Sequence, residues 1–231
     1  METLADPPIQ PIKVATTNWQ PFMISDTDQI TGIDAEITQL IMERLRATTI
    51  FRKCPFKRCL AEMEKGVLDL QSGIAFNEER NKYLLYLEPS YSKVSVKFYT
   101  KAGKNSILSR YEDLYKIKVG SVVKSHYFEP FNSDLKINKH KAFKEEDLFP
   151  LLQKRRVDVI IGTNPNLDYQ ILQHGLKGEF EATKYDPQKE VPLYFAISRK
   201  SPLISYAEQI SEILQKLKDN GIIEKIESKY R

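Results

Sequence analysis

The apolar positions of the first ninety residues fall into short runs that alternate with amphipathic segments. Three of the runs predict buried strands, at residues 12–16, 50–52 and 67–74. Each strand is followed by a predicted helix: Gly32 opens the first, with Asp34 as its cap, the second covers residues 55–65 and stops at Gly66, and Asn77 caps the third. This alternation predicts an α/β fold, in which helices cover the faces of a mostly parallel sheet.

After a segment with a different pattern of apolar and polar residues, a second series of alternating strands and helices follows. Residues 92–100 and 191–198 alternate apolar and polar side chains with a period of two, which predicts two strands. Between them we expect strands at residues 116–120, 142–143 and 157–161, a short helix capped by Ser125, and a helix at 145–155 that Pro150 delays or kinks. The tail, residues 202–231, is predicted to be helical with a break at 220–221.

The two halves share a weak repeat. EMEKGVLDLQSGI and LLQKRRVDVIIGT each contain a helix end, a strand and then a glycine, so that Asp69 matches Asp158 and Gly73 matches Gly162. The repeat predicts two lobes built alike, with a ligand bound beyond the carboxyl ends of their strands. The two strands of period two bracket the second lobe, and we expect them to form a two-strand hinge.

Composition and charge narrow the possible classes of protein. The 231 residues are 41% hydrophobic and 29% charged, with a formal net charge of +4. No apolar run approaches the roughly 18 residues of a membrane span. METLADPPIQP has no basic region followed by an apolar core, so we expect no signal peptide, and the chain is cytosolic or was exported and then lost its signal. No basic stripe interleaved with aromatic residues indicates nucleic-acid binding.

Two cysteines, Cys54 and Cys59, lie close together in KCPFKRC. They do not form a zinc pattern, which needs four ligands, and the chain has three histidines. They form either a small disulfide in an oxidising compartment or two free, buried thiols. We expect no metal and no cofactor.

Arg80 is the first candidate for a binding residue, because it lies three residues after the predicted cap Asn77. The free N–H groups of a helix N-terminus attract anions. A guanidinium beside them adds a planar pair of donors that suits a carboxylate. This position predicts a carboxylate site.

Five segments in this order resemble motifs of the extracellular solute-binding proteins of the amino-acid type, the periplasmic receptors of ABC importers. NWQPF resembles Y-x-P-F, GIDAEI resembles G-F-D-x-D/E-L, and SGIAFNEERNKYLLYLEPSY resembles S-G-M-T-I-T-x-E-R-x-K…F-S-x-P-Y. IKVGSVVKS resembles V-G-V-Q-x-G-T, and RVDVIIGT resembles R-V-D-A-V-V-x-D. The resemblance covers nearly the whole chain.

The resemblance implies a two-lobed type II periplasmic-binding fold, in which each lobe is a mostly parallel sheet flanked by helices. Lobe 1 would comprise residues 10–98 and 195–231, and lobe 2 residues 99–194. It further implies a monomeric periplasmic receptor without catalytic residues. This receptor would close its lobes on a small carboxylate-bearing solute, an amino acid or a related compound, and deliver it to the membrane permease of an ABC importer.

The resemblance also implies which residues bind the ligand: Trp19, Phe56, Ser72, Gly73, Ala75, Arg80, Ser125 and Thr163. Arg80 would clamp a ligand carboxylate, helped by the backbone near Gly73 and Ala75. Ser125 would complete that anion site on closure. The aromatic rings of Trp19 and Phe56 would wall the ligand.

Thr163 and Ala75 depart from the family pattern. The family often has a hydroxyl where this chain has Ala75, and the acid that usually pairs with the ligand's α-ammonium falls at Thr163. Removing one partner of a buried ion pair costs about 3–5 kcal/mol, whereas a micromolar ligand has about 8 kcal/mol in total. Either Asp168 or Glu129 replaces the acid, or the ligand has no ammonium there. We favour the second, with a neutral hydroxyl from Thr163.

Two other functions are compatible with the same fold. A dehydratase-type enzyme would need an acid or base at its cleft, and His126, next to Ser125, is the candidate. A sensory module for a signalling partner would use the same ligand-driven closure as a transport receptor. A transmembrane helix or a kinase following residue 231 in the full gene product would indicate sensing.

Overall fold

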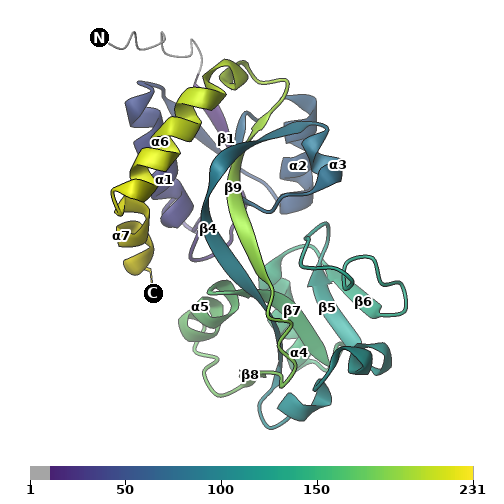
Figure 1. Cartoon of the computed structure of the whole chain (residues 1–231). Coiled ribbons are helices and arrows are strands. Elements are labelled where there is room, and N and C mark those ends of the chain that lie inside the picture. Colours follow the sequence, from purple (N-terminus) through teal and green to yellow (C-terminus); the bar gives the residue numbers. More distant parts are fainter. Residues whose placement is uncertain (1–10, 231) are drawn as a thin grey trace. The chain divides into compact units, whose positions relative to one another are not determined.

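The computed structural model describes residues 11–230, which form two compact units (Figure 1). Unit 1 contains the residues up to Lys93 and those from Pro192 onward, and unit 2 is Val94–Val191. Two strands, β4 (Leu84–Lys101) and β9 (Glu190–Ser198), continue from one unit into the other. The N-terminal segment on which the expected absence of a signal peptide rests lies outside the described residues. None of the helices within residues 11–230 is long and apolar enough to cross a membrane.

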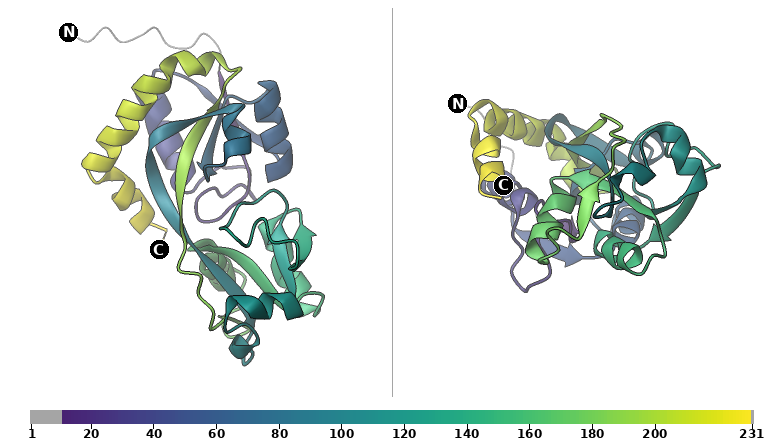
Figure 2. Two further views of the ribbon diagram at one scale, coloured as in Figure 1. Left: turned by 45° about the vertical axis from the view of Figure 1, so that its right-hand side comes forward. Right: turned by 90° about the horizontal axis from the view of Figure 1, so that it is seen from below.

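Unit 1 has the predicted alternation of strands and helices. Its elements before β4 are β1 (Ile12–Thr16), α1 (Ile33–Arg44), β2 (Thr49–Lys53), α2 (Phe56–Lys65), β3 (Leu70–Ile74) and α3 (Glu78–Asn81). The sheet order is β2-β1-β3-β9-β4, in which β1 is parallel to β2 and β3, and β9 is antiparallel to β3. The predicted tail is α6 (Ala207–Asp219) and α7 (Ile222–Ser228). These two helices pack with α1 on one side of the sheet, and α2 lies on the other side (Figures 1 and 2).

Unit 2 repeats this architecture with fewer helices. Its elements are β5 (Lys118–Val122), β6 (Asn138–Ala142), α4 (Leu148–Gln153), β7 (Val159–Asn164), α5 (Asn166–Gln173) and β8 (Phe180–Ala182). The sheet order is β4-β7-β5-β6, and β8 adds to β4. β5 is parallel to β6 and β7, and β4 is antiparallel to β7. The sequence did not predict α5 or β8.

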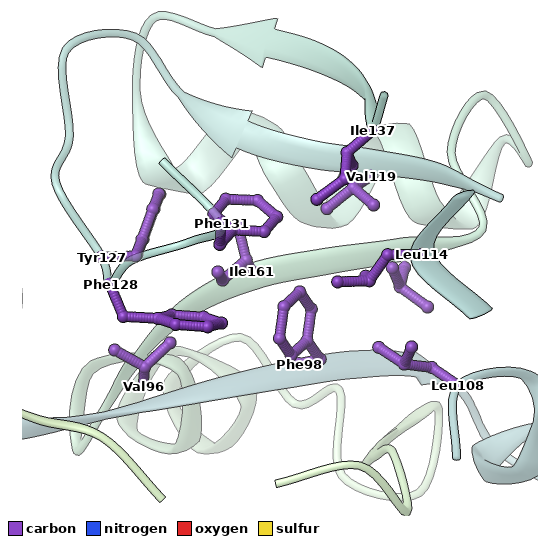
Figure 3. Packing of buried hydrophobic residues seen from close by; sticks show 11 residues of the cluster. Val96, Phe98, Leu108, Leu114, Val119, Tyr127, Phe128, Phe131, Ile137 and Ile161 are labelled. Atoms are coloured by element: carbon purple, nitrogen blue, oxygen red, sulfur yellow. The ribbon is translucent and has the colours of Figure 1, made fainter. Parts of the chain in front are cut away.

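One face of the unit 2 sheet carries an aromatic core (Figure 3). Phe98 of β4 packs edge-on against Phe131, at 5.8 Å between ring centroids, and Phe128 stacks on Phe131 at 5.7 Å. Val119 of β5 and Ile161 of β7 complete this face. Burying such rings removes 150–250 Å² each from water. The core therefore holds the loop after β5 firmly against the strands.

The sequence repeat corresponds to equivalent contacts in the two units. In unit 1 the Asp69 side chain accepts from the Lys13 N–H at 2.8 Å, and the Asp69 N–H donates to the Lys13 carbonyl. In unit 2 Asp158 makes the same two contacts with Lys118, at 2.7 Å and 2.9 Å. Asp69 thus joins the start of β3 to the start of β1, and Asp158 joins the start of β7 to the start of β5. The prediction that the halves are built alike is confirmed at these positions.

Three local predictions differ from the structure or are refined by it. Asp34 is not the cap of α1, because Gly32 occupies that position at a φ of 109°, and Asp34 is buried within the first turn. Ser125 caps no helix. Residues 123–137 form turns and irregular segments, since Lys124 has a φ of 64° and the aromatic core draws the loop inward. The α-helical part of 145–155 begins at Leu148, which leaves Pro150 in the first turn, where its missing N–H removes no helical bond.

Cys54 and Cys59 form a disulfide, which decides between the two alternatives that the sequence left open. Cys54 follows β2, Pro55 is the N-cap of α2, and the first turn of α2 brings Cys59 back to within 5.5 Å, Cα to Cα. The disulfide thus ties the end of an outer strand to the helix that follows it.

We expect reduction of this disulfide to lower the free energy of unfolding by about 2 kcal/mol, the entropy of closing a loop of this length in the unfolded chain. Urea denaturation with and without dithiothreitol measures the difference. The Cys54→Ser/Cys59→Ser double variant is the control and should match the reduced protein in both conditions. Unchanged stability after complete reduction, verified by thiol titration, would contradict the prediction.

Candidate functional site

The carboxyl end of β3 in unit 1 is closely packed around Gly73. Gly73 has a φ of 63°, a conformation that side chains rarely adopt. A Cβ atom there would lie 2.8 Å from Asp34 Oδ2 and 3.0 Å from the ring of Trp19. The structure therefore brings together two residues of the predicted site, Trp19 and Gly73, and places the Asp34 carboxylate beside Gly73.

Asp34 is a buried carboxylate with two hydroxyl partners. Its side chain is 1% exposed. The Tyr91 hydroxyl donates to Oδ1 at 2.5 Å, and Ser72 also hydrogen-bonds the carboxylate. Burial raises the pKa of Asp34 to about 6, although both hydroxyls favour the charged form. The sequence indicated Asp34 as a helix cap and missed this role, because its partner Tyr91 is 57 positions away.

The Trp19 loop is fixed to the start of α1. The Asp34 N–H donates to the Phe22 carbonyl at 2.8 Å, and the Ile33 N–H donates to the Pro21 carbonyl at 3.2 Å. Trp19 stacks on Phe22 at 4.8 Å between ring centroids and stays half-buried. The loop is therefore held in place by the helix N-terminus, and the Trp19 ring covers Gly73.

Arg80 lies in the short helix α3, as the sequence predicted. The Asn77 side chain caps this helix by accepting from the Arg80 N–H at 3.1 Å. The Arg80 side chain is 6% exposed, its Nη1 donates to the Ala75 carbonyl at 3.4 Å, and the guanidinium lies 5.3 Å over the ring of Phe56. Burial lowers the pKa of Arg80, but a guanidinium stays charged at neutral pH. Three predicted site residues, Phe56, Ala75 and Arg80, are thus in contact.

Tyr86 is a residue of this cluster that the sequence did not indicate. Its hydroxyl donates to the Ala75 carbonyl at 3.2 Å and hydrogen-bonds the Arg80 guanidinium. Its ring contacts Phe76 and Tyr194, at centroid distances of 5.1 and 5.9 Å. Desolvation raises the pKa of Tyr86 to about 12, so the hydroxyl is protonated at neutral pH. The motif comparison could have found it, because Tyr86 stands where the family motif has Phe.

Unit 2 holds the two remaining predicted residues, each bonded within its own unit. The Thr163 hydroxyl donates to the Asn166 side-chain oxygen at 2.9 Å. Ser125 follows β5, and its hydroxyl hydrogen-bonds Tyr127, whose own hydroxyl accepts from the Val122 N–H at 3.1 Å. Both predicted residues are therefore near the carboxyl ends of β5 and β7.

The two acids proposed to compensate for Thr163 are each hydrogen-bonded to other side chains. Thr163 is two residues after Ile161 and shares its face of β7, the face of the aromatic core. Asp168 is bonded to the Tyr99 hydroxyl, and Tyr99 belongs to the core on the opposite face. The other candidate, Glu129, is exposed to solvent and accepts from the Ser133 hydroxyl.

His126, the candidate catalytic residue, lies in the turn region after β5 and not on a helix. Its Nε2 is 3.4 Å from the Asn132 amide nitrogen. The Asn132 amide is neither an acid nor a base at neutral pH, and His126 also interacts electrostatically with the Glu129 carboxylate.

Comparison with known proteins identifies relatives over nearly the whole chain. The model of the bacterial extracellular solute-binding proteins, family 3, matches residues 12–231. The probable amino-acid-binding protein YxeM of Bacillus subtilis is 22% identical over 220 residues, which are 94% of this chain and 81% of that protein.

Solved structures with the same fold are also found. The substrate-binding protein of an amino acid ABC transporter has a TM-score of 0.82 at 18% identity, covering 95% of this chain and 98% of the other. AbpA of Streptococcus pneumoniae, bound to L-arginine, has a TM-score of 0.81 at 22% identity, with 94% and 92% covered. A histidine kinase sensor domain similar to periplasmic binding proteins has a TM-score of 0.84 at 19% identity, with 96% of both chains covered.

Proposed function

Because the chain belongs to the bacterial extracellular solute-binding proteins, family 3, we propose that it is a non-enzymatic receptor for a small carboxylate-bearing solute. Its fold is the α/β fold of type II periplasmic binding proteins. The observation that carries the proposal is the position of Arg80, buried among aromatic rings at the end of β3 with its guanidinium fixed by Ala75 and Tyr86.

The chemistry of this cluster suits a carboxylate. A guanidinium has five N–H donors in a planar arrangement and binds a carboxylate through two parallel hydrogen bonds. Burial strengthens such bonds because the surrounding dielectric constant is lower than that of water. Phe56 holds the plane of the guanidinium through a cation–π contact, which limits the rotations that binding would otherwise freeze.

The partner and location that we propose are those typical of the family. Several relatives are substrate-binding proteins of amino acid ABC transporters, and the receptor is therefore proposed to act in the periplasm, as a monomer, and to deliver its solute to the membrane permease of such an importer. The likeness to a histidine kinase sensor domain supports a second candidate, ligand sensing for a signalling partner. Import of the solute by cells that lack the gene would distinguish the two, because a sensor is dispensable for uptake.

A thermal-shift screen tests the proposed function directly. It should cover the amino acids, their deaminated keto- and hydroxy-acid analogues, dicarboxylates and small oligopeptides. A ligand at one hundred times its Kd stabilises the folded protein by about 2.7 kcal/mol. We expect hits among compounds with a carboxylate and none among the corresponding amides. A hit whose amide stabilises the protein equally would contradict a carboxylate site.

For a hit from that screen, we expect Arg80→Ala to weaken binding by at least about 30-fold, because the loss of even one charge-assisted hydrogen bond has an effect of this size and the guanidinium offers two. Titration of Trp19 fluorescence measures the Kd, since Trp19 is the single tryptophan of the chain and borders Gly73. Arg58→Ala is the matched control, because Arg58 lies on the exposed side of α2 and pairs with Glu62. Equal affinity of the Arg80 variant and the control would place the anion site elsewhere.

A further inference from the structure

The Ala75 carbonyl, the hydrogen-bond acceptor beside Arg80, already accepts two hydrogen bonds. The Ala75 carbonyl accepts from Arg80 Nη1 at 3.4 Å and from the Tyr86 hydroxyl at 3.2 Å. A carbonyl oxygen has two lone pairs, so these two donors occupy its capacity. Tyr86 in turn accepts from the Asn77 N–H, which fixes the phenol at the start of α3.

The Asp34 carboxylate, which lies near the end of β3, already accepts hydrogen bonds from protein groups. Asp34 is 1% exposed, and the Tyr91 and Ser72 hydroxyls bond its carboxylate. Asp34 Oδ2 lies 2.8 Å from the position that a Cβ atom at Gly73 would take, and the Trp19 ring lies 3.0 Å from the same position. At 1% exposure, the Asp34 carboxylate is shielded from a ligand by the surrounding protein.

We propose that Tyr86 is a specificity-determining residue, and that the unit 1 site takes a carboxylic acid that has no ammonium group next to its carboxylate. This inference rests on the proposed function, because it concerns the ligand that Arg80 binds. The class comprises deaminated acids such as aliphatic, aryl-alkyl and dicarboxylic acids.

An ammonium group next to the ligand carboxylate needs hydrogen-bond acceptors. It has three N–H donors and loses its water on binding, and each unsatisfied buried donor weakens affinity. The Ala75 carbonyl would have to release Tyr86 or Arg80 to accept from it. The positive charge of Arg80 also disfavours a second cation nearby. A ligand with a carboxylate and no ammonium group leaves no donor unsatisfied and is not repelled by Arg80, because it uses only the donors of the guanidinium.

Matched pairs of acids test the inference on the intact protein: 3-phenylpropanoate with L-phenylalanine, 4-methylpentanoate with L-leucine, and glutarate with L-glutamate. Calorimetry gives the Kd of each member. We expect the deaminated acid of the best-binding pair to bind at least about tenfold tighter than its amino acid. An amino acid that binds as tightly as its deaminated partner would overturn the inference.

Tyr86→Phe tests the role of the hydroxyl itself. It releases one lone pair of the Ala75 carbonyl, and we expect the preference for the deaminated acid to fall by about fivefold, the effect of one neutral hydrogen bond. Tyr83→Phe is the matched control: Tyr83 is also close to Arg80, but the donors to the Ala75 carbonyl are Arg80 and Tyr86. The control should keep the wild-type preference.

The outcomes separate this inference from the proposed function. If Arg80→Ala weakens binding and Tyr86→Phe leaves the preference unchanged, Arg80 binds the ligand but Tyr86 does not set its class. If neither variant changes any Kd, the proposed site itself is wrong. A lower melting temperature of Tyr86→Phe with an unchanged preference would indicate a merely structural hydroxyl and would also overturn the inference.

Discussion

Gly73→Ala is expected to lower the free energy of unfolding by about 3 kcal/mol. A left-handed φ costs a residue with a Cβ atom about 1 kcal/mol, and forcing an extra methyl group into a packed site costs about 1–3 kcal/mol more. The methyl group would lie 2.8 Å from Asp34 Oδ2. The carboxylate cannot move aside cheaply, because Tyr91 and Ser72 hold it. Urea denaturation followed by circular dichroism measures the loss.

Gly175→Ala is the matched control for the backbone conformation. Gly175 has nearly the same φ, 66°, and no atom lies within 4 Å of its Cβ position. We expect this variant to lose about 1 kcal/mol, the conformational part alone. Equal losses for the two variants would show that Asp34 and Trp19 yield to the methyl group and that the packing at Gly73 is loose.

Asp34→Asn is expected to stabilise the protein by about 3 kcal/mol at pH 7.5. The pKa of Asp34 is about 6 in the folded protein, compared with 3.8 for an unperturbed aspartate, because burial disfavours the charge. Each pH unit of that difference corresponds to about 1.4 kcal/mol. Asparagine is neutral and of the same shape, and its amide can still accept from Tyr91 and donate to Ser72.

The contribution of Asp34 to the stability of the protein decreases as the pH rises. The folded protein holds the Asp34 proton more tightly than the unfolded chain, so the stability of the protonated form is fully present below pH 3.8 and is lost as the pH rises through about 6. The stabilisation by Asp34→Asn should therefore grow across this window and level off above it. Denaturation at pH 4, 6 and 7.5 measures it, and an advantage that does not change with pH would contradict the buried charge.

Glu36→Gln, on the same helix, is the control with the opposite sign. Lys229 and Tyr230 bond Glu36, and these contacts hold its pKa below 4.5 although partial burial opposes them. The stability that this carboxylate contributes is present above pH 4.5 and is lost as the pH falls through its lowered pKa. We expect Glu36→Gln to destabilise the protein at pH 7.5.

Local sequence determined most of the secondary structure of unit 1. Gly66 ends α2 in the left-handed conformation, and Asn77 caps α3 through a bond to the Arg80 N–H. Such signals act within four residues, where propensity and capping decide. The repeat also identified Asp69 and Asp158, which join equivalent strands in the two units. Together with the ordered motifs, these local signals were sufficient to predict the family and the fold.

Tertiary structure decided the chemistry around those elements. Asp34 has the local signature of a helix cap, but burial of the helix N-terminus raises its pKa, and its hydrogen-bond partner Tyr91 lies 57 residues away. Ser125 has the signature of a cap too, but the aromatic core on the unit 2 sheet outweighs it and no helix forms. Tyr86 gained its role because the fold places its hydroxyl at the Ala75 carbonyl. Burial and hydrogen-bond partners depend on which distant segments pack together, and sequence patterns of a few residues do not contain that information.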